Sequence, residues 1–101
     1  MGIPFFFKQP SEQYSIGFEF AGKLPSSTNL SSGTVSAKDL ATGTDVSTTI
    51  LGSTNATIVG TQAMVMVKAG TTGAKYKITF LVLLTNGNVL EEDVQMVVDD
   101  K

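Results

Sequence analysis

The acidic residues near the end of the chain are the side chains whose type and spacing could do chemistry. Glu91, Glu92 and Asp93 are consecutive, and Asp99-Asp100 follows them. Carboxylate oxygens of this kind bind hard cations, and a facing pair of carboxylates can act as general acid and base. In a strand, however, Glu91 and Asp93 point to one face and Glu92 to the other, so they do not converge on one ion. The pattern favours a solvated strand face that discourages pairing at a sheet edge.

Nucleophilic chemistry has little support in the composition. The chain contains no histidine and no cysteine, so its many Ser and Thr hydroxyls have no imidazole beside them. The glycine-containing stretch Gly70-Thr71-Thr72-Gly73 lacks the lysine and the helix of a phosphate-binding loop, and it is expected to be the turn that enters a strand. We therefore expect a protein that is not an enzyme, with no catalytic residues, no cofactor and no bound metal. A metal-dependent enzyme centred on Glu91 to Asp93 is the weaker alternative.

Charge and hydropathy argue against nucleic acid and membranes as partners. The net charge is −2, and the seven basic residues are lysines scattered along the chain, so they form no basic stripe for phosphates. An apolar run such as Phe80 to Leu84 is far shorter than the roughly 18 residues that a membrane-spanning helix needs. The start, Met1 to Phe7, lacks the basic region and the cleavage site of a signal peptide. The absence of cysteine fits a reducing cytosol, or a bacterial or phage origin.

The element that must position the acidic cluster is a β-hairpin over residues 76–98. Apolar and more polar residues alternate on both sides of Asn86-Gly87, and a period of two indicates strands. A two-residue turn would set apolar side chains against polar ones, so we predict a three-residue turn, Thr85-Asn86-Gly87, with a bulge. The register that follows pairs Tyr76 with Met96, Ile78 with Val94 and Val82 with Leu90.

Turn-forming clusters divide the rest of the chain into short strands. The predicted strands are Tyr14 to Phe20, Thr34 to Lys38, Thr44 to Leu51, Ala56 to Val59 and Thr61 to Lys68. No helix is expected, because no apolar set recurs at a spacing of three and four. With the hairpin these make an all-β fold, an Ig-like β-sandwich of about seven antiparallel strands with the C-terminal hairpin Tyr76–Val98 central. We expect one sandwich domain over residues 11–101, preceded by an N-terminal arm over residues 1–10.

Apolar side chains on the outward side of predicted strands are the candidate interface. Leu81 and Leu83 lie opposite the core-facing side chains, where an isolated sandwich should be polar. Either the chain covers them itself, with Phe5, Phe6 and Phe7 as the obvious cover, or another subunit does. Met64 and Met66 share the face opposite Ala63, Val65 and Val67, where they form a soft contact surface or else fill space in the core or at a sheet edge. The predicted interface residues are therefore Phe5, Phe6, Phe7, Leu81, Leu83, Met64 and Met66.

Three segments together resemble a known family. They are Lys8-x-Pro10-x-Glu12-x-Tyr14, then Gly70-Thr71-Thr72-Gly73-x-x-Tyr76-x-Ile78-Thr79, and finally Thr85-Asn86-Gly87 before an acidic-opening last strand. Over about Lys8 to Val98 the chain resembles the small phage and prophage proteins called fibre-tail adaptors, which are compact β-sandwich components of the virion. Family members often carry arginines in the last hairpin, where this chain has Asn88 and Glu91.

The resemblance implies a structural role. It predicts an assembly module that joins tail or fibre subunits by protein–protein contacts, with other tail or fibre proteins, or further copies of itself, as partners. It places the protein in the bacterial cytoplasm during assembly and then in the virion, encoded by a phage or prophage. The alternative from another class is a surface module that binds a ligand or carbohydrate through its loops. Tyr14 and Tyr76 are its only tyrosines for stacking on a sugar, and both fall on predicted core faces.

Overall fold

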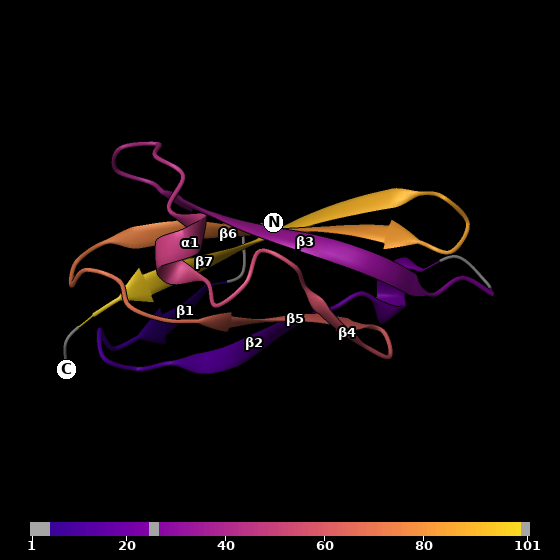
Figure 1. Cartoon of the computed structure of the whole chain (residues 1–101), viewed down its shortest axis with the longest axis horizontal. Helices are drawn as coiled ribbons and strands as arrows, with labels where there is room; N and C mark the ends of the chain where they lie inside the picture. The colour runs from indigo at the N-terminus through magenta and orange to yellow at the C-terminus, as the bar shows by residue number, and fades with distance from the viewer. Residues whose placement is uncertain (1–4, 25–26, 100–101) are drawn as a thin grey trace.

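The computed structural model describes residues 5–24 and 27–99, which form two β-sheets packed face to face (Figure 1). The larger sheet has the strand order β1-β7-β6-β3, and the smaller one has the order β2-β5-β4. In chain order the elements are β1 (Phe5–Lys8), β2 (Tyr14–Glu19), the 3₁₀ turn η1 (Ala21–Lys23), β3 (Leu30–Asp39), α1 (Ser47–Ile50), β4 (Thr57–Val59), β5 (Gln62–Val67), β6 (Lys75–Leu84) and β7 (Val89–Val98). The predicted all-β sandwich is confirmed. The first four residues of the expected arm, and Asp100 of the acidic pair, lie outside the described residues.

The C-terminal hairpin occupies the centre of the larger sheet in the predicted register. Tyr76 pairs with Met96, Ile78 with Val94 and Val82 with Leu90. The connection is the predicted three-residue turn, in which the Gly87 amide donates to the Leu84 carbonyl at 3.0 Å and the Leu84 amide to the Asn88 carbonyl at 2.8 Å. Gly87 has φ +90°, a conformation that glycine adopts without the steric penalty of a side chain. The alternation of apolar and polar residues therefore predicted the length of the turn as well as the positions of the strands.

The core lies between the two sheets and is built from alternate residues of each strand. All five even-numbered residues from Tyr76 to Leu84 are buried, and so are Val94, Met96 and Val98 on β7. The smaller sheet contributes Ala63, Val65 and Val67 from the inward face of β5. The rings of Phe18 on β2 and Phe80 on β6 lie with their centroids 6.3 Å apart and join the two layers. Burial of these side chains is the main favourable term in folding.

The expectation of antiparallel pairing throughout is wrong at β1. This strand pairs in parallel with β7, with Phe5 opposite Gln95 and Lys8 opposite Val98. Nearly the whole chain separates β1 from β7, so no hairpin forces them to run in opposite directions. The segment expected as an N-terminal arm thus adds a short strand to one edge of the larger sheet.

The predicted strand over Thr44 to Leu51 is also wrong, because Ser47–Ile50 forms the single-turn helix α1. Isolated bridges remain on either side of it, from Asp45 to β3 and from Leu51 to β5. The β-branched residues here favour a strand. The chain must nevertheless cross from β3 to β5, and the helical turn makes that crossing while it buries Ile50 and Ser47.

A carboxylate holds this turn in place and makes it sensitive to acid. Asp45 Oδ1 accepts hydrogen bonds from the Ser47 hydroxyl at 2.7 Å and the Ser47 amide at 2.8 Å. Ser47 Oγ in turn accepts from the Ala37 amide on β3 at 2.9 Å. These bonds, and then the nearby charge of Lys38, lower the pKa of Asp45 below its ordinary value of 3.8.

We expect the contribution of Asp45 to stability to be present above pH 3.8 and to be lost as the pH falls through its lowered pKa. Urea denaturation of the wild type and of Asp45→Asn measures this contribution. The wild type should have the higher midpoint at pH 7, and the difference should disappear at the acid end. A difference that is the same at both ends would contradict the role of the charge. In the background Ser47→Ala, which removes the hydroxyl, the Asp45→Asn effect should be smaller.

Candidate functional site

Three exposed apolar side chains gather on the outward face of the larger sheet, at its hairpin end. Leu81 and Leu83 on β6 are 42% and 41% exposed, and Val89 on β7 is 56% exposed. The strand register sets Leu83 directly opposite Val89. Together with Ser32 and Thr34 on β3 they line a shallow hollow of about 160 Å³. We call Leu81, Leu83 and Val89 the leucine patch.

The segment Phe5 to Phe7 does not cover the leucine patch, so the expectation of self-cover is wrong. As part of β1 it lies beside Gln95 to Val97, at the other end of β7. Phe5 and Phe7 point outward and are 64% and 56% exposed, with their rings edge to face at 5.7 Å between centroids. Phe6 points inward and packs against the core, with its ring 6.3 Å from that of Tyr14. The outward face therefore carries two separate apolar areas.

The acidic cluster is split between two faces, as its position in a strand predicts. Glu92 lies on the same side of the sheet as Phe80, its register partner, and forms an ion pair with Lys23 of η1 at 2.6 Å. Asp93 lies on the outward side and accepts a hydrogen bond from Thr79 Oγ1 at 2.7 Å. Within residues 5–24 and 27–99, no three potential metal ligands of the His, Cys, Asp or Glu type come together. The arrangement supports neither a metal site nor a facing pair of carboxylates at this cluster.

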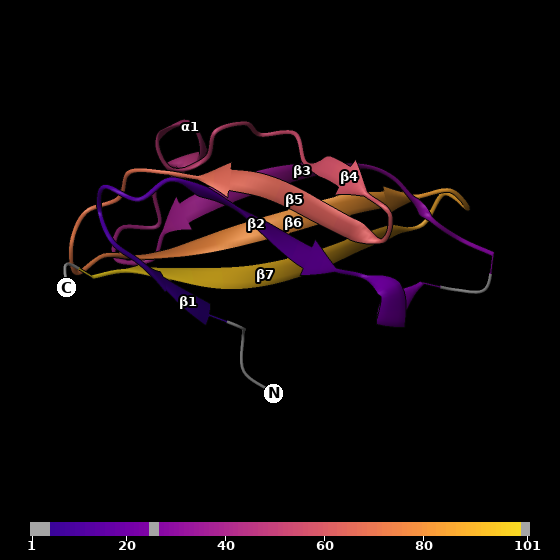
Figure 2. The same cartoon turned by 90° about the horizontal axis from the view of Figure 1, so that it is seen from below.

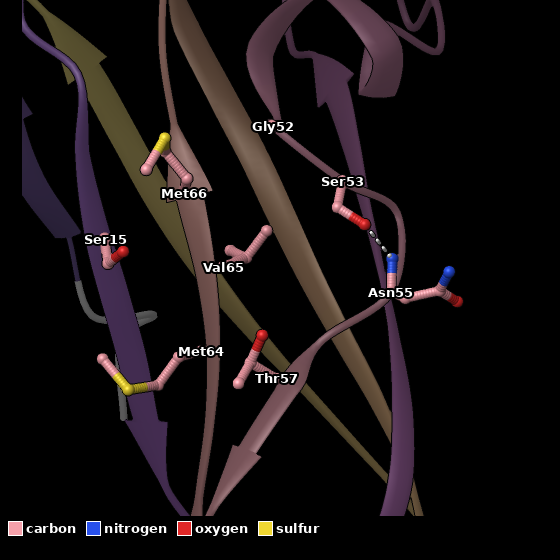
Figure 3. Close-up of a pocket in the computed structure, with 8 residues that line it drawn as sticks. All are labelled: Ser15, Gly52, Ser53, Asn55, Thr57, Met64, Val65 and Met66. Atoms are coloured by element: carbon pink, nitrogen blue, oxygen red, sulfur yellow. Dashed lines mark hydrogen bonds between the residues drawn. The ribbon is translucent and has the colours of Figure 1, made fainter.

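Met64 and Met66 lie on the outward face of the smaller sheet, where they border a groove of about 360 Å³ (Figure 3). The groove forms because the chain after Gly52 leaves β5 and returns to it at Thr57. Gly52 N donates to Met66 O at 2.8 Å, and Thr57 pairs with Met64, while the intervening residues pair with β3. Polar residues complete the rim, namely Ser15, Ser53, Asn55 and Thr57. The result is an uncharged groove with a thioether wall, suited to an apolar side chain more than to an ion.

Neither tyrosine is available to stack on a sugar. Tyr76 is buried, and its hydroxyl accepts a hydrogen bond from the Thr71 amide at 3.1 Å. Tyr14 is half-buried, and its hydroxyl donates to the Phe7 carbonyl at 3.2 Å. Both rings thus help to build the sandwich, and the carbohydrate-binding alternative loses the two tyrosines considered for stacking on a sugar.

Comparison with known protein families decides which kind of protein carries these surfaces. Residues 8–97 match the family described as "Podophage GP4 fiber-tail adaptor protein gp77". The chain belongs to this adaptor family. The match begins at the last residue of β1 and ends one residue before the end of β7, so it covers β2 to β6 and nearly all of β7. We found no match to a curated protein or to a solved structure.

Membership of the adaptor family agrees with the resemblance seen in the three sequence segments. Adaptors of phage tails are a structural, non-enzymatic kind of protein. Among the residues that the structure describes, no helix has the length and apolar character needed to cross a membrane.

One residue of the leucine patch, Val89, was missed by the sequence analysis. The signal was available, because Val89 shares its parity with Glu91 and Asp93 and is therefore on the outward face. That Val89 joins the apolar patch follows only from the strand register, which places Leu83 directly opposite Val89.

Proposed function

We propose that this adaptor is a non-enzymatic assembly module of a phage or prophage particle, which joins tail or fibre subunits by protein–protein contacts. The leucine patch is its main docking surface. The protein is present in the bacterial cytoplasm during assembly and then becomes part of the virion.

The exposure of Leu81, Leu83 and Val89 carries this proposal. The outward face beyond them bears Lys77, Thr79 and other polar or charged side chains, as expected of a sheet that faces water. A contiguous exposed apolar area rimmed by polar residues is typical of an interaction site, and a contact with another protein is one such site. Its centre on the rigid central hairpin suits a contact that must hold one orientation.

The other predicted interface residues supply further contacts in this proposal. Phe5 and Phe7 lie on the same outward face as the leucine patch, with Phe6 supporting their strand from the core side. Met64 and Met66 lie on the opposite face of the sandwich, on the smaller sheet. Contacts on both faces would allow one adaptor to touch two neighbouring subunits at once.

The double variant Leu81→Lys/Leu83→Lys tests the proposal. Two buried lysines at a contact should lower the amount of adaptor in purified particles by about tenfold or more, since loss of an interface hot spot costs roughly 2 kcal/mol. The measurement is the ratio of adaptor to tail proteins by quantitative mass spectrometry. The thermal midpoint of the free variant should change little, because both side chains point to solvent.

Leu40→Lys is the matched control, because Leu40 is exposed and apolar but lies outside the leucine patch and outside the smaller sheet that carries Met64 and Met66. It should enter particles at the wild-type ratio. Incorporation of the double variant at the wild-type ratio would contradict the leucine patch as the docking surface. Particles with intact tails that contain no wild-type adaptor would contradict the proposed function as a whole.

A further inference from the structure

The two edges of the larger sheet differ in how their backbone groups are paired. At the β3 edge, the chain's own loop pairs with the strand, since Val35 N donates to Thr54 O at 2.8 Å and Ala56 N donates to Gly33 O at 2.9 Å. At the opposite edge, β1 pairs only with the stretch of β7 from Gln95 to Val98. Figure 2 shows β1 beside the part of β7 that leads to the C-terminus. Over Val89–Val94, no described strand lies next to β7 on that side.

The direction of the backbone groups along this open edge follows from the ladder with β6. Residues 84 and 88 form a hydrogen-bonded pair at one end of the hairpin, and residues 74 and 98 form another at its other end. Bonded pairs alternate along an antiparallel ladder, so Leu90, Glu92 and Val94 exchange their bonds with β6. The amide and carbonyl groups of the residues between them, Val89, Glu91 and Asp93, therefore point to the open edge.

A regular continuation of β1 toward the N-terminus would leave a gap in the hydrogen-bond ladder at Asp93. Lys8 O accepts a hydrogen bond from the Asp99 amide at 2.9 Å, so the even-numbered residues of β1 direct their backbone groups at β7. The next even-numbered residue toward the N-terminus is Pro4, which has no amide hydrogen. A longer β1 would therefore have no donor for the Asp93 carbonyl.

The side chains along the open edge restrict what can pair with it. Glu91 and Asp93 project from the outward face, and Glu92 projects from the inward face toward Lys23. Two copies joined edge to edge would bring acidic strand against acidic strand, which is unfavourable between neighbouring strands. A strand with Lys or Arg at alternate positions would instead meet opposite charges at Glu91 and Asp93, and an apolar residue beside Val89 would extend the leucine patch.

We propose that the open edge of β7, Val89–Val94, accepts an extended basic strand from another virion protein, which completes the sheet in line with β1. This inference rests on the proposed function and names the mode of contact and the chemistry of the partner. Main-chain hydrogen bonds to Val89, Glu91 and Asp93 supply affinity, while the outward side chains set register and specificity. The leucine patch lies beside this strand and is covered by the same partner.

Hydrogen exchange read by mass spectrometry tests the inference on the wild-type protein, free and in purified particles. In the free protein, the amides of Val89, Glu91 and Asp93 should exchange rapidly, while those of Leu90, Glu92 and Val94 are protected by β6. In particles, all three open-edge amides should become protected. Rapid exchange of these amides in particles that contain the adaptor would overturn the inference but leave the proposed function standing. Protection already present in the free protein would also overturn it, because the chain itself or a second copy would then cover the edge.

Variants at Glu91 separate the backbone from the side chain. Glu91→Pro removes an amide hydrogen that points to the open edge, so it costs no bond to β6 and is tolerated on an edge strand. Glu91→Ala removes the same charge but keeps the amide. We expect Glu91→Pro to enter particles about tenfold less than Glu91→Ala, with circular dichroism confirming that both are folded. Equal incorporation of the two folded variants would overturn the strand-addition mode, and hydrogen exchange on the wild type decides the matter if Glu91→Pro does not fold.

Discussion

Gly70→Ala is expected to lower the free energy of unfolding by about 3 kcal/mol. Gly70 has φ +103°, a conformation that costs roughly 1–3 kcal/mol for a residue with a side chain. A Cβ atom added there would lie only 2.7 Å from Cγ2 of Val98, which is fully buried at the end of β7. Overpacking of this kind costs about 1–3 kcal/mol more. For a domain of this size, the sum corresponds to a fall in Tm of about 15 °C.

Two further variants identify the cause of the Gly70 effect. The neighbouring Ala69 has φ +53°, so Ala69→Gly removes a strained side chain and should raise stability by about 1 kcal/mol. Val98→Ala removes the atom that would clash, so Gly70→Ala should cost less in that background than in the wild type. Thermal denaturation of the wild type, the three single variants and the double variant measures these differences. An unchanged Tm for Gly70→Ala would contradict both the backbone and the packing arguments.

Lys8→Met should lower the free energy of unfolding by about 2 kcal/mol, because it removes the donor for three backbone carbonyls. Lys8 is 1% exposed, and its Nζ donates to the carbonyls of Gln9 at 2.8 Å, Pro10 at 3.3 Å and Ala69. Methionine fills a similar space but donates no hydrogen bond, and each buried acceptor left unpaired costs about 1–3 kcal/mol. Some of these carbonyls form hydrogen bonds with water in the variant. The expected loss of stability is therefore close to the cost of one unpaired carbonyl and not of three. Urea denaturation at pH 7 measures the change.

The pH dependence of the Lys8 effect follows from the same burial. Removal from water lowers the pKa of Lys8 below its ordinary value of 10.5, against the opposing charge of Glu12. Between the lowered pKa and 10.5 the unfolded chain binds more protons than the folded one, so the contribution of Lys8 to stability rises with pH in that window. The difference in stability between wild type and Lys8→Met should rise in parallel. Lys75→Met, at an exposed lysine of β6, is the control and should change stability by less than about 0.5 kcal/mol at pH 7.

The two buried features meet at one corner of the molecule. Ala69, whose carbonyl binds Lys8, directly precedes Gly70, whose backbone lies against Val98. Lys8 and Val98 are also register partners in the parallel pair of β1 and β7. The turn before β6 is thus tied to the edge strand β1, and we expect both variants to loosen the same end of the sandwich. This end is distant along β7 from the leucine patch, so loss of stability and loss of docking can be measured separately.

Most of the fold could be predicted from the sequence because its strongest signals are local. Alternation along residues 76–98 gave strands, and parity across Asn86-Gly87 gave both the turn and the register. The same parity argument predicts that Glu92 lies on the opposite face of the sheet from Glu91 and Asp93, which agrees with the partners of Glu92 and Asp93. There were two exceptions. The strand β1 pairs in parallel with β7, which lies at the other end of the chain, and α1 is a helical turn among β-branched residues. Both depend on contacts with distant strands, which outweigh local propensity.

The sequence by itself determined the all-β class and the central hairpin, since these rest on alternation and on turn residues that act within a few positions of one another. The adaptor family follows from the match over residues 8–97. Only the tertiary structure decided which apolar side chains stay exposed. Leu81 and Leu83 are exposed on the outward face of β6, and Phe5 to Phe7, which the sequence offered as their cover, are held instead in β1 at the far end of β7. It likewise decided that the β3 edge is covered by the loop at Thr54 and Ala56, while none of the described strands pairs with the β7 edge over Val89–Val94. Edges and exposed faces are properties of the whole assembly of strands, and no local pattern in the chain carries them.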